Sequence, residues 1–194
     1  MDPPNNQQAW KLILWVWLVN MVTTPVIFYL SFRLLSGKPQ DLQTYSSFLW
    51  GFLVPWNQFG FFFTNFAIDP ALYEEFLFRF PIIIAISVLS WLGYSLKNSN
   101  LSRILTVGIA IGLNVWWASG HIPILAGFEQ NGTHIVKYYY FLFPPVFFSG
   151  LTWIWLTLKI QPAWPWPSIV AHILANTSIY VALKVAELIG VKIF

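Results

Sequence analysis

The sequence contains no cysteine and few charged side chains, and each shortage excludes a class of protein. Without cysteine there is no disulfide framework, no thiolate metal site and no catalytic thiol, so any chemistry rests on carboxylates, imidazoles, hydroxyls and amides. Charged residues fill 9% of the 194 positions, whereas soluble domains carry about 25%. Such a chain cannot cover a globular surface with charge, and its 57% of hydrophobic residues also excludes intrinsic disorder.

The basic residues are too scattered for a nucleic-acid partner. The formal net charge is +3, and the lysines and arginines stand singly between apolar blocks instead of forming a stripe. A nucleic-acid-binding face needs such a cluster. We therefore expect no nucleic acid as a partner, and the apolar composition indicates that a lipid bilayer surrounds the chain.

Six long apolar stretches follow one another along the sequence. A spanning helix needs about 20 mostly apolar residues, and such stretches cover residues 10–35, 48–66, 70–96, 101–128, 138–158 and 168–189. The second contains Gly51, Pro55 and Gly60, which favours a broken or re-entrant segment. The sequence predicts an all-α polytopic bundle of about six transmembrane helices. Residues 1–194 would form one domain of a multi-pass integral membrane protein, in the plasma membrane if the source is a bacterium.

The third stretch opens with three ionisable side chains, Glu74, Glu75 and Arg79. A charge at the centre of a spanning helix costs about 2.5 to 3.5 kcal/mol and usually faces a polar cavity. Glu75 and Arg79 are four residues apart on one helix face, so these two alone are typical of a structural ion pair. Glu74 points about 100° away from Glu75 and needs another explanation.

Two histidines and an asparagine lie in two other stretches. His172 and Asn176 are one helical turn apart and present an imidazole and an amide in one direction, which suits them to hold a polarised oxygen. His121 lies near the end of the fourth stretch, whose antiparallel neighbour begins beside Glu74. We therefore expect Glu74 and His121 to meet, and all six polar residues to line one pocket.

If all six stretches cross the membrane fully, His172 lies far from Glu74. At about 1.5 Å per residue from Ser168, His172 lies only about 6 Å inside the membrane face opposite Glu74. The site closes only if the preceding proline-rich stretch already lies inside the bilayer or if one helix does not fully cross it. We expect the first, because Pro165 and Pro167 exclude regular helix there.

Three motifs, in order along the chain, carry a resemblance to a known family. They are Glu-Glu-Phe-Leu-Phe-Arg at 74–79, Trp-Ala-Ser-Gly-His at 117–121 and His-Ile-Leu-Ala-Asn at 172–176, which fit Glu-Glu-x-x-x-Arg, aromatic-x-x-x-His and His-x-x-x-Asn. This trio, within a motif core of about 70–180, resembles the CPBP family of intramembrane proteases. That family includes the type II CAAX prenyl endopeptidases and the bacteriocin-processing and self-immunity proteins of the Abi group.

The resemblance implies a metal-independent, glutamate-dependent endopeptidase that needs no cofactor. Its substrate would be a peptide or membrane protein, such as a prenylated or leader peptide. Carried across by position, Glu74 and His121 would activate water, His172 and Asn176 would hold the oxyanion, and Glu75 and Arg79 would organise the site.

The sequence departs from the family pattern at two points. The aromatic residue of the second motif is Trp117, where phenylalanine is usual, and this exchange keeps an aromatic packing residue. The chain is also shorter than the eukaryotic prenyl endopeptidases, so a CAAX substrate does not follow from the resemblance.

Three other functions remain open on the sequence alone. Glu74, Glu75, His121 and His172 have the donor atoms of a zinc or iron site, although no His-Glu-x-x-His is present and Arg79 competes with a cation for Glu75. A non-catalytic scaffold or bacteriocin-immunity protein would keep the fold and bind a peptide in the same cavity. A small transporter or proton relay could use the same groups, but the sequence shows no inverted pair of broken helices.

Overall fold

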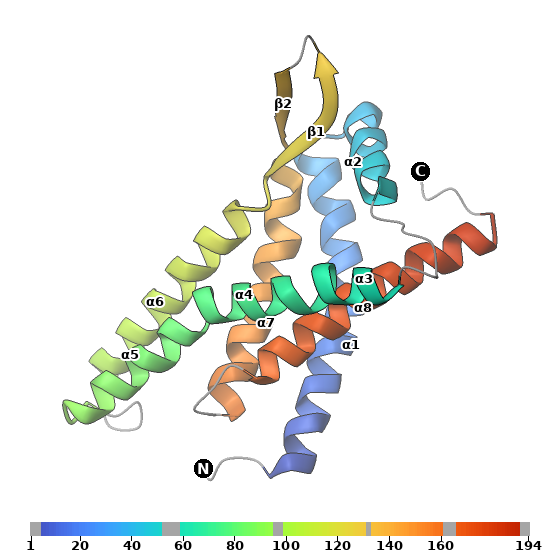
Figure 1. Cartoon of the computed structure of the whole chain (residues 1–194). Coiled ribbons are helices and arrows are strands. Elements are labelled where there is room, and N and C mark those ends of the chain that lie inside the picture. Colours follow the sequence, from blue (N-terminus) through green and yellow to red (C-terminus); the bar gives the residue numbers. More distant parts are fainter. Residues whose placement is uncertain (1–4, 52–58, 95–98, 131–132, 161–165, 191–194) are drawn as a thin grey trace.

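The computed structural model describes residues 5–51, 59–94, 99–130, 133–160 and 166–190, and most of them are helical (Figure 1). The elements in chain order are α1 (Asn6–Leu35), α2 (Pro39–Gly51), α3 (Phe59–Phe62), a π-helical segment η2 (Phe63–Ile68), α4 (Asp69–Phe78), α5 (Phe80–Trp91), α6 (Asn100–Ser119), β1 (Pro123–Gln130), β2 (Thr133–Tyr138), a 3-10 turn η3 (Tyr140–Leu142), α7 (Phe143–Ile160) and α8 (Trp166–Leu188).

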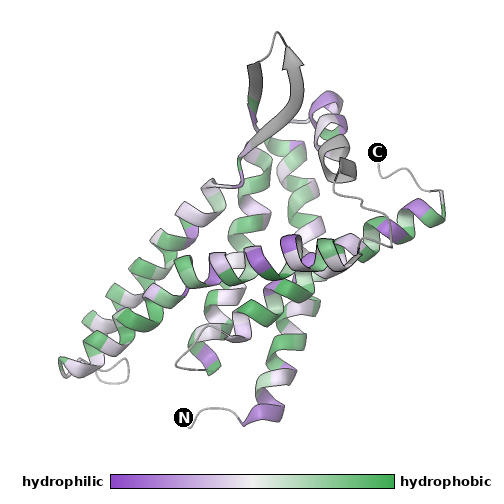
Figure 2. Ribbon diagram, in the orientation of Figure 1, coloured by the Kyte–Doolittle hydropathy of each residue, from purple (hydrophilic) through white to green (hydrophobic). Residues whose placement is uncertain are grey.

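Four helical segments of the described chain are long and apolar enough to cross a membrane. They are Asn6–Leu35, Asn100–Ser119, Tyr140–Ile160 and Trp166–Leu188. Most of their ribbon has the colour of hydrophobic residues (Figure 2), and large apolar side chains such as Trp15, Leu34 and Ile104 are exposed. The expectation of a bundle containing apolar helices of membrane-spanning length is confirmed, but the expectation of six such helices is wrong for the described residues.

The third predicted span is divided into two short helices. Arg79 ends α4 and precedes α5, and Pro81 occupies the first turn of α5. Proline has no N–H, and its ring clashes with the carbonyl four residues earlier, which favours the break observed at this point. On the other side of the break, α4 follows α3 and η2 without a gap, so the helical run before Arg79 covers residues 59–78.

The fourth predicted span ends earlier than expected. Its helix α6 stops at Ser119, and residues expected to be helical up to Phe128 instead form β1 of an antiparallel hairpin with β2, in which Pro123 pairs with Tyr138. Pro123 excludes a continuing helix and biases the residue before it toward extended backbone. The hairpin is the one departure from an all-α fold among the described residues, and it projects beyond the bundle at the end where α2 lies (Figure 1).

The second predicted span and the proline-rich stretch are only partly described. Pro55 and Pro165 lie outside the described residues, so the expected re-entrant segment and the position of the proline-rich stretch in the bilayer stay predictions. Pro167, which we expected to exclude regular helix, lies in the first turn of α8. A first-turn residue needs no N–H partner within the helix, so proline is accepted there.

The bundle is built on α1 and α7, with α8 and α4 crossing them and the antiparallel pair α5 and α6 extending to one side (Figure 1). The central core combines side chains from α1, α4, α6, α7 and α8, among them Ile13, Phe78, Trp117, Leu156 and Ala171.

Polar contacts also connect the long helices. Nδ2 of buried Asn20 donates to Oγ1 of Thr152 at 2.8 Å, and Nε1 of Trp17 donates to Oγ of Ser178 at 3.0 Å. Interhelical hydrogen bonds of this kind contribute about 0.6 kcal/mol each in membrane proteins. These contacts hold α1 against α7 and α8, and so fix the helix that carries His172.

Candidate functional site

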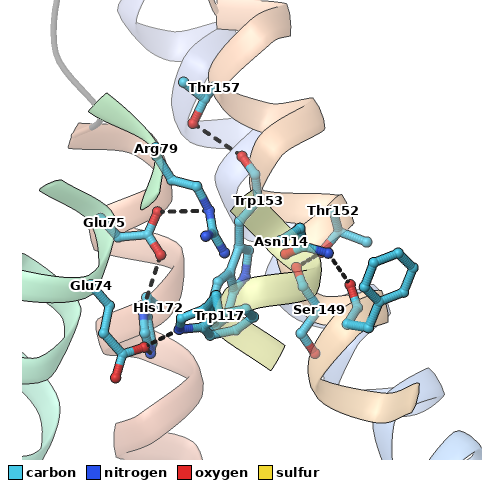
Figure 3. Close-up of polar contacts among 11 residues, drawn as sticks. Glu74, Glu75, Arg79, Asn114, Trp117, Ser149, Thr152, Trp153, Thr157 and His172 are labelled. Atoms are coloured by element: carbon cyan, nitrogen blue, oxygen red, sulfur yellow. Dashed lines mark hydrogen bonds and ion pairs between the residues drawn. The ribbon is translucent and has the colours of Figure 1, made fainter. Parts of the chain in front are cut away.

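Two consecutive carboxylates on α4 form the centre of the site. The side chain of Glu75 is fully buried, whereas that of Glu74 is 22% exposed. Neighbouring residues on a helix point about 100° apart, so the two carboxylates have different surroundings. Figure 3 shows Glu75 between Arg79 and His172, and Glu74 beside His172 and Trp117. The two groups are therefore suited to different tasks.

The Glu75 carboxylate is held from several sides. Oε2 lies 3.4 Å from Nε of Arg79, and Oε1 lies 3.2 Å from Nδ1 of His172. The hydroxyl of buried Ser168 also hydrogen-bonds to this carboxylate. A buried charge is tolerated when it is paired and hydrogen-bonded, and these contacts connect α4 to α8. Glu75 is a fixed group that orders its neighbours.

Arg79, the cationic partner of Glu75, also contacts two tryptophan rings. Its guanidinium carbon lies 4.6 Å from the ring centroid of Trp117 and 6.0 Å from that of Trp153, and the side chain is fully buried. A desolvated cation over an indole face is stabilised by the ring quadrupole. The break between α4 and α5 occurs at this residue. Arg79 therefore joins α4 to both α6 and α7.

His172 is the imidazole that contacts both acids. Besides its contact with Glu75, its Nε2 lies 3.9 Å from Oε2 of Glu74. The ring is stacked on Trp153, with centroids 4.2 Å apart and planes inclined by 27°. A carboxylate only accepts hydrogen bonds, so Nδ1 carries the proton that points at Glu75. This fixes the ring with Nε2 toward Glu74.

Trp117 makes the shortest contact of the site. Its indole Nε1 donates to Oε2 of Glu74 at 2.5 Å, from a side chain that is 4% exposed. The sequence motif assigned Trp117 an aromatic packing role only, so this hydrogen bond was missed. A signal was present, because a buried indole N–H usually finds an acceptor and phenylalanine at this position would need none.

His121 is held against Trp117 at the end of α6. Its Nδ1 lies 2.9 Å from the carbonyl oxygen of Trp117, and the two rings meet edge to face with centroids 5.0 Å apart. A carbonyl only accepts, so Nδ1–H donates and Nε2 is the acceptor nitrogen of the neutral ring. In the described chain, His121 forms no ion pair with Glu74 within 4 Å. The indole of Trp117 is what makes direct contact with Glu74 from α6.

Asn176 lies one turn beyond His172 on α8 and is half-buried. The structure thus brings Glu74, Glu75, Arg79 and His172 together in direct contacts, with His121 connected through Trp117 and Asn176 on the helix that carries His172.

A glycine behind the site sets the spacing of α6 and α7. A Cβ atom at Gly150 would collide with Oδ1 of Asn114 and lie 2.7 Å from the ring of Trp117. Nδ2 of Asn114 donates to the carbonyl of Phe147 at 2.8 Å, which ties the same two helices together. Because Trp117 lies at this close approach, the helix packing fixes the indole that contacts Glu74.

The residues of the site do not form a ready metal centre. Within the described ranges, no group of three or more His, Asp or Glu side chains is arranged so that it could hold a metal ion. One oxygen of Glu75 faces Arg79, whose charge opposes a second cation at the same carboxylate.

No protein-family model, curated protein or solved structure matches this chain.

Proposed function

We propose that this protein is an intramembrane endopeptidase in which Glu74 activates a water molecule for attack on a peptide bond. The observation that carries the proposal is the difference between the two carboxylates on α4. Glu75 is fully buried and bound by Arg79 and His172, whereas the Glu74 side chain is 22% exposed beside the same imidazole. A general base needs a reachable carboxylate and a fixed partner, and Glu74 meets both conditions.

The proposed reaction needs only protein groups and water. Glu74 takes a proton from water as the water oxygen attacks the carbonyl carbon of the peptide bond. His121 supports the water through Nε2, the acceptor nitrogen of its neutral ring. As the C–N bond breaks, Glu74 returns the proton to the leaving amine. A carboxylic acid and an amine are released, and near neutral pH they ionise to a carboxylate and an ammonium group. The chemistry uses no metal and no cofactor.

Donors are needed for the oxygen that becomes negative during attack. We assign this role to His172 and Asn176, one turn apart on α8. When both nitrogens of His172 are protonated, Nδ1 donates to Glu75 and Nε2–H is available to the oxyanion. The Glu75 carboxylate, which is paired with Arg79, orients this ring through its contact with Nδ1, as the aspartate of a catalytic triad orients its histidine.

The membrane part of the proposal concerns topology and partners. We propose that α1, α6, α7 and α8 each cross the bilayer, with α7 crossing together with η3, and that α4 and α5 remain within it as short helices. The protein would then be a multi-pass membrane protein whose substrate is a peptide or membrane protein with access to Glu74 from the lipid or its surface. The three ordered sequence motifs support this assignment.

The test is a search for hydrolysis by the purified protein in detergent. A mixed library of apolar peptides is incubated in water enriched in ¹⁸O, and new carboxyl termini are identified by mass spectrometry. The expected result is cleavage at defined bonds with one ¹⁸O per new terminus, lost in Glu74→Gln. Asp69→Asn is the matched control, because Asp69 is exposed on the same helix α4. Absence of cleavage by the parent, or equal cleavage by Glu74→Gln, contradicts the proposal and favours a non-catalytic scaffold or immunity protein.

A further inference from the structure

We propose that Trp117 is a positioning residue for the Glu74 carboxylate: its indole N–H holds one carboxylate oxygen and so selects the other as the oxygen that takes a proton from water. This inference rests on the proposed function, in which Glu74 is the base. It gives Trp117 a role beyond the packing expected of an aromatic residue in its motif.

The first support is that both α6 and α8 approach the same oxygen of Glu74. Nε1 of Trp117 lies 2.5 Å from Oε2, and Nε2 of His172 lies 3.9 Å from that same atom. Figure 3 shows the other oxygen of Glu74 pointing away from the labelled side chains. A carboxylate bound at Oε2 therefore presents Oε1 to an incoming water.

The second support is that the indole has little freedom to move. Trp117 is 4% exposed, with Arg79 over its ring at 4.6 Å and Trp153 at 5.4 Å between centroids. Gly150 allows α7 to approach its outer edge. A donor fixed by packing on this many sides sets the position of its acceptor, because neither partner can turn away without leaving a buried N–H unpaired.

The third support is the chemistry of the pair. A carboxylate can rotate about its last side-chain bond, and this torsion has a broad energy minimum. One strong hydrogen bond to a charged acceptor favours the bound orientation over the others by a factor of about ten to a hundred. That preference is enough to fix the rotation. A base held in one orientation keeps its reacting oxygen in line with the bound water, which is the geometric condition for efficient proton transfer.

A purely structural role for Trp117 would predict something different. If the indole only fills space, phenylalanine should serve nearly as well once the protein has folded. The variant Trp117→Phe keeps an aromatic ring under Arg79 and removes the N–H donor. Trp116→Phe is the matched control, because Trp116 is the adjacent residue of α6, is 60% exposed and contacts Phe78 edge to face.

The first measurement reports the hydrogen bond without requiring activity. The protein is labelled with ¹⁵N at its indole nitrogens, and the Trp117 signal is assigned in detergent micelles by its loss in Trp117→Phe. A short bond to a carboxylate moves the indole proton signal downfield. We expect Glu74→Gln to move this signal upfield and Asp69→Asn to leave it in place. An unchanged signal in Glu74→Gln overturns the inference.

The second measurement reports catalysis on the most rapidly cleaved peptide of the library described above. We expect Trp117→Phe to lower kcat by about tenfold to a hundredfold with little change in KM, and Trp116→Phe to match the parent. Equal kcat in Trp117→Phe and the parent overturns the positioning role and leaves the proposed function intact. A parent without cleavage overturns the proposed function and with it this role, and the indole signal then shows whether the hydrogen bond exists independently.

Discussion

Nδ1 of His172 lies 3.2 Å from Oε1 of Glu75, and this contact joins helices α8 and α4 across 97 positions of sequence. The carboxylate continues to Arg79 through its other oxygen, 3.4 Å from Nε. One buried glutamate thus orients the imidazole that faces Glu74. The roles that we propose follow from these contacts. Glu75 orients His172 and Arg79, and Glu74 acts as the general base.

Removal of Arg79 should damage the fold more than removal of the Glu74 charge. Arg79→Met leaves the fully buried Glu75 carboxylate without its cation, and breaking a buried pair from one side costs about 3 to 5 kcal/mol. We expect a clear fall in the apparent melting temperature in detergent and a lower yield of monodisperse protein. Glu74→Gln should lower neither.

A double variant separates the lost charge partner from lost packing around Arg79. Arg79→Met combined with Glu75→Gln removes both charges, so part of the stability lost in Arg79→Met should return. Equal melting temperatures for Arg79→Met and the double variant would show that packing of the arginine side chain, and not its pairing with Glu75, is what the fold requires.

The close approach of α6 and α7 can be tested at a glycine. A methyl group at Gly150 would collide with Asn114 and press on Trp117, and overpacking of this kind typically costs about 1 to 3 kcal/mol. We expect Gly150→Ala to lower the free energy of unfolding, measured by denaturant titration in mixed micelles. It should also lower turnover, because it displaces the indole that contacts Glu74.

Gly112 provides the control for this prediction. It lies on α6, and a Cβ atom there would meet nothing within 4 Å. Alanine is favoured over glycine inside a helix by up to about 1 kcal/mol, so Gly112→Ala should be neutral or stabilising. A loss of stability in Gly112→Ala as large as that in Gly150→Ala would contradict the assignment of close packing to Gly150 alone.

Turnover should survive removal of metal ions. The proposed base is a carboxylate and the proposed oxyanion donors are side chains, so no step requires a Lewis acid. We expect the purified enzyme to keep its activity after exhaustive chelation and to contain no stoichiometric zinc, iron or manganese by elemental analysis. One bound metal per chain, with activity lost on its removal and restored on its return, would make Glu74, Glu75 and His172 ligands instead.

Asn176 gives a prediction that separates binding from catalysis. A donor to the oxyanion acts on charge that develops in the transition state, so its loss should lower kcat by about 10²- to 10³-fold and change KM little. Asn176→Ala on a cleaved peptide measures this, and the amide has no titration near neutral pH to complicate the result. An unchanged kcat would remove Asn176 from the proposed oxyanion site.

Hydropathy identified the long helices well and failed where local chemistry interrupts an apolar stretch. The span predicted at 168–189 corresponds to α8, and that at 10–35 to most of α1. Pro81 lies in the first turn of α5 and Pro123 begins β1, and a hydropathy average does not register the backbone N–H that each proline lacks.

Motif spacing placed the polar residues in one region and could not assign their contacts. Glu75 and Arg79 are paired, as their four-residue separation predicts. The expected meeting of Glu74 with His121 depends on how α6 is rotated, which the spacing does not determine. The hydrogen bond from Trp117 to Glu74 depends on an indole N–H, which a pattern of aromatic positions does not represent. Packing between helices, set in part by Gly150, decides these contacts.

The most direct test of the account is the turnover number of Glu74→Gln on a peptide that the parent cleaves. Glutamine keeps the size of the side chain and its hydrogen-bond acceptor for Trp117 but cannot accept the proton from water. Loss of a general base typically costs about 10²- to 10⁴-fold. The account predicts a fall of that size in kcat, at unchanged folded yield by size-exclusion chromatography, with full activity in Asp69→Asn. A Glu74→Gln variant that turns over at the parent rate would contradict it.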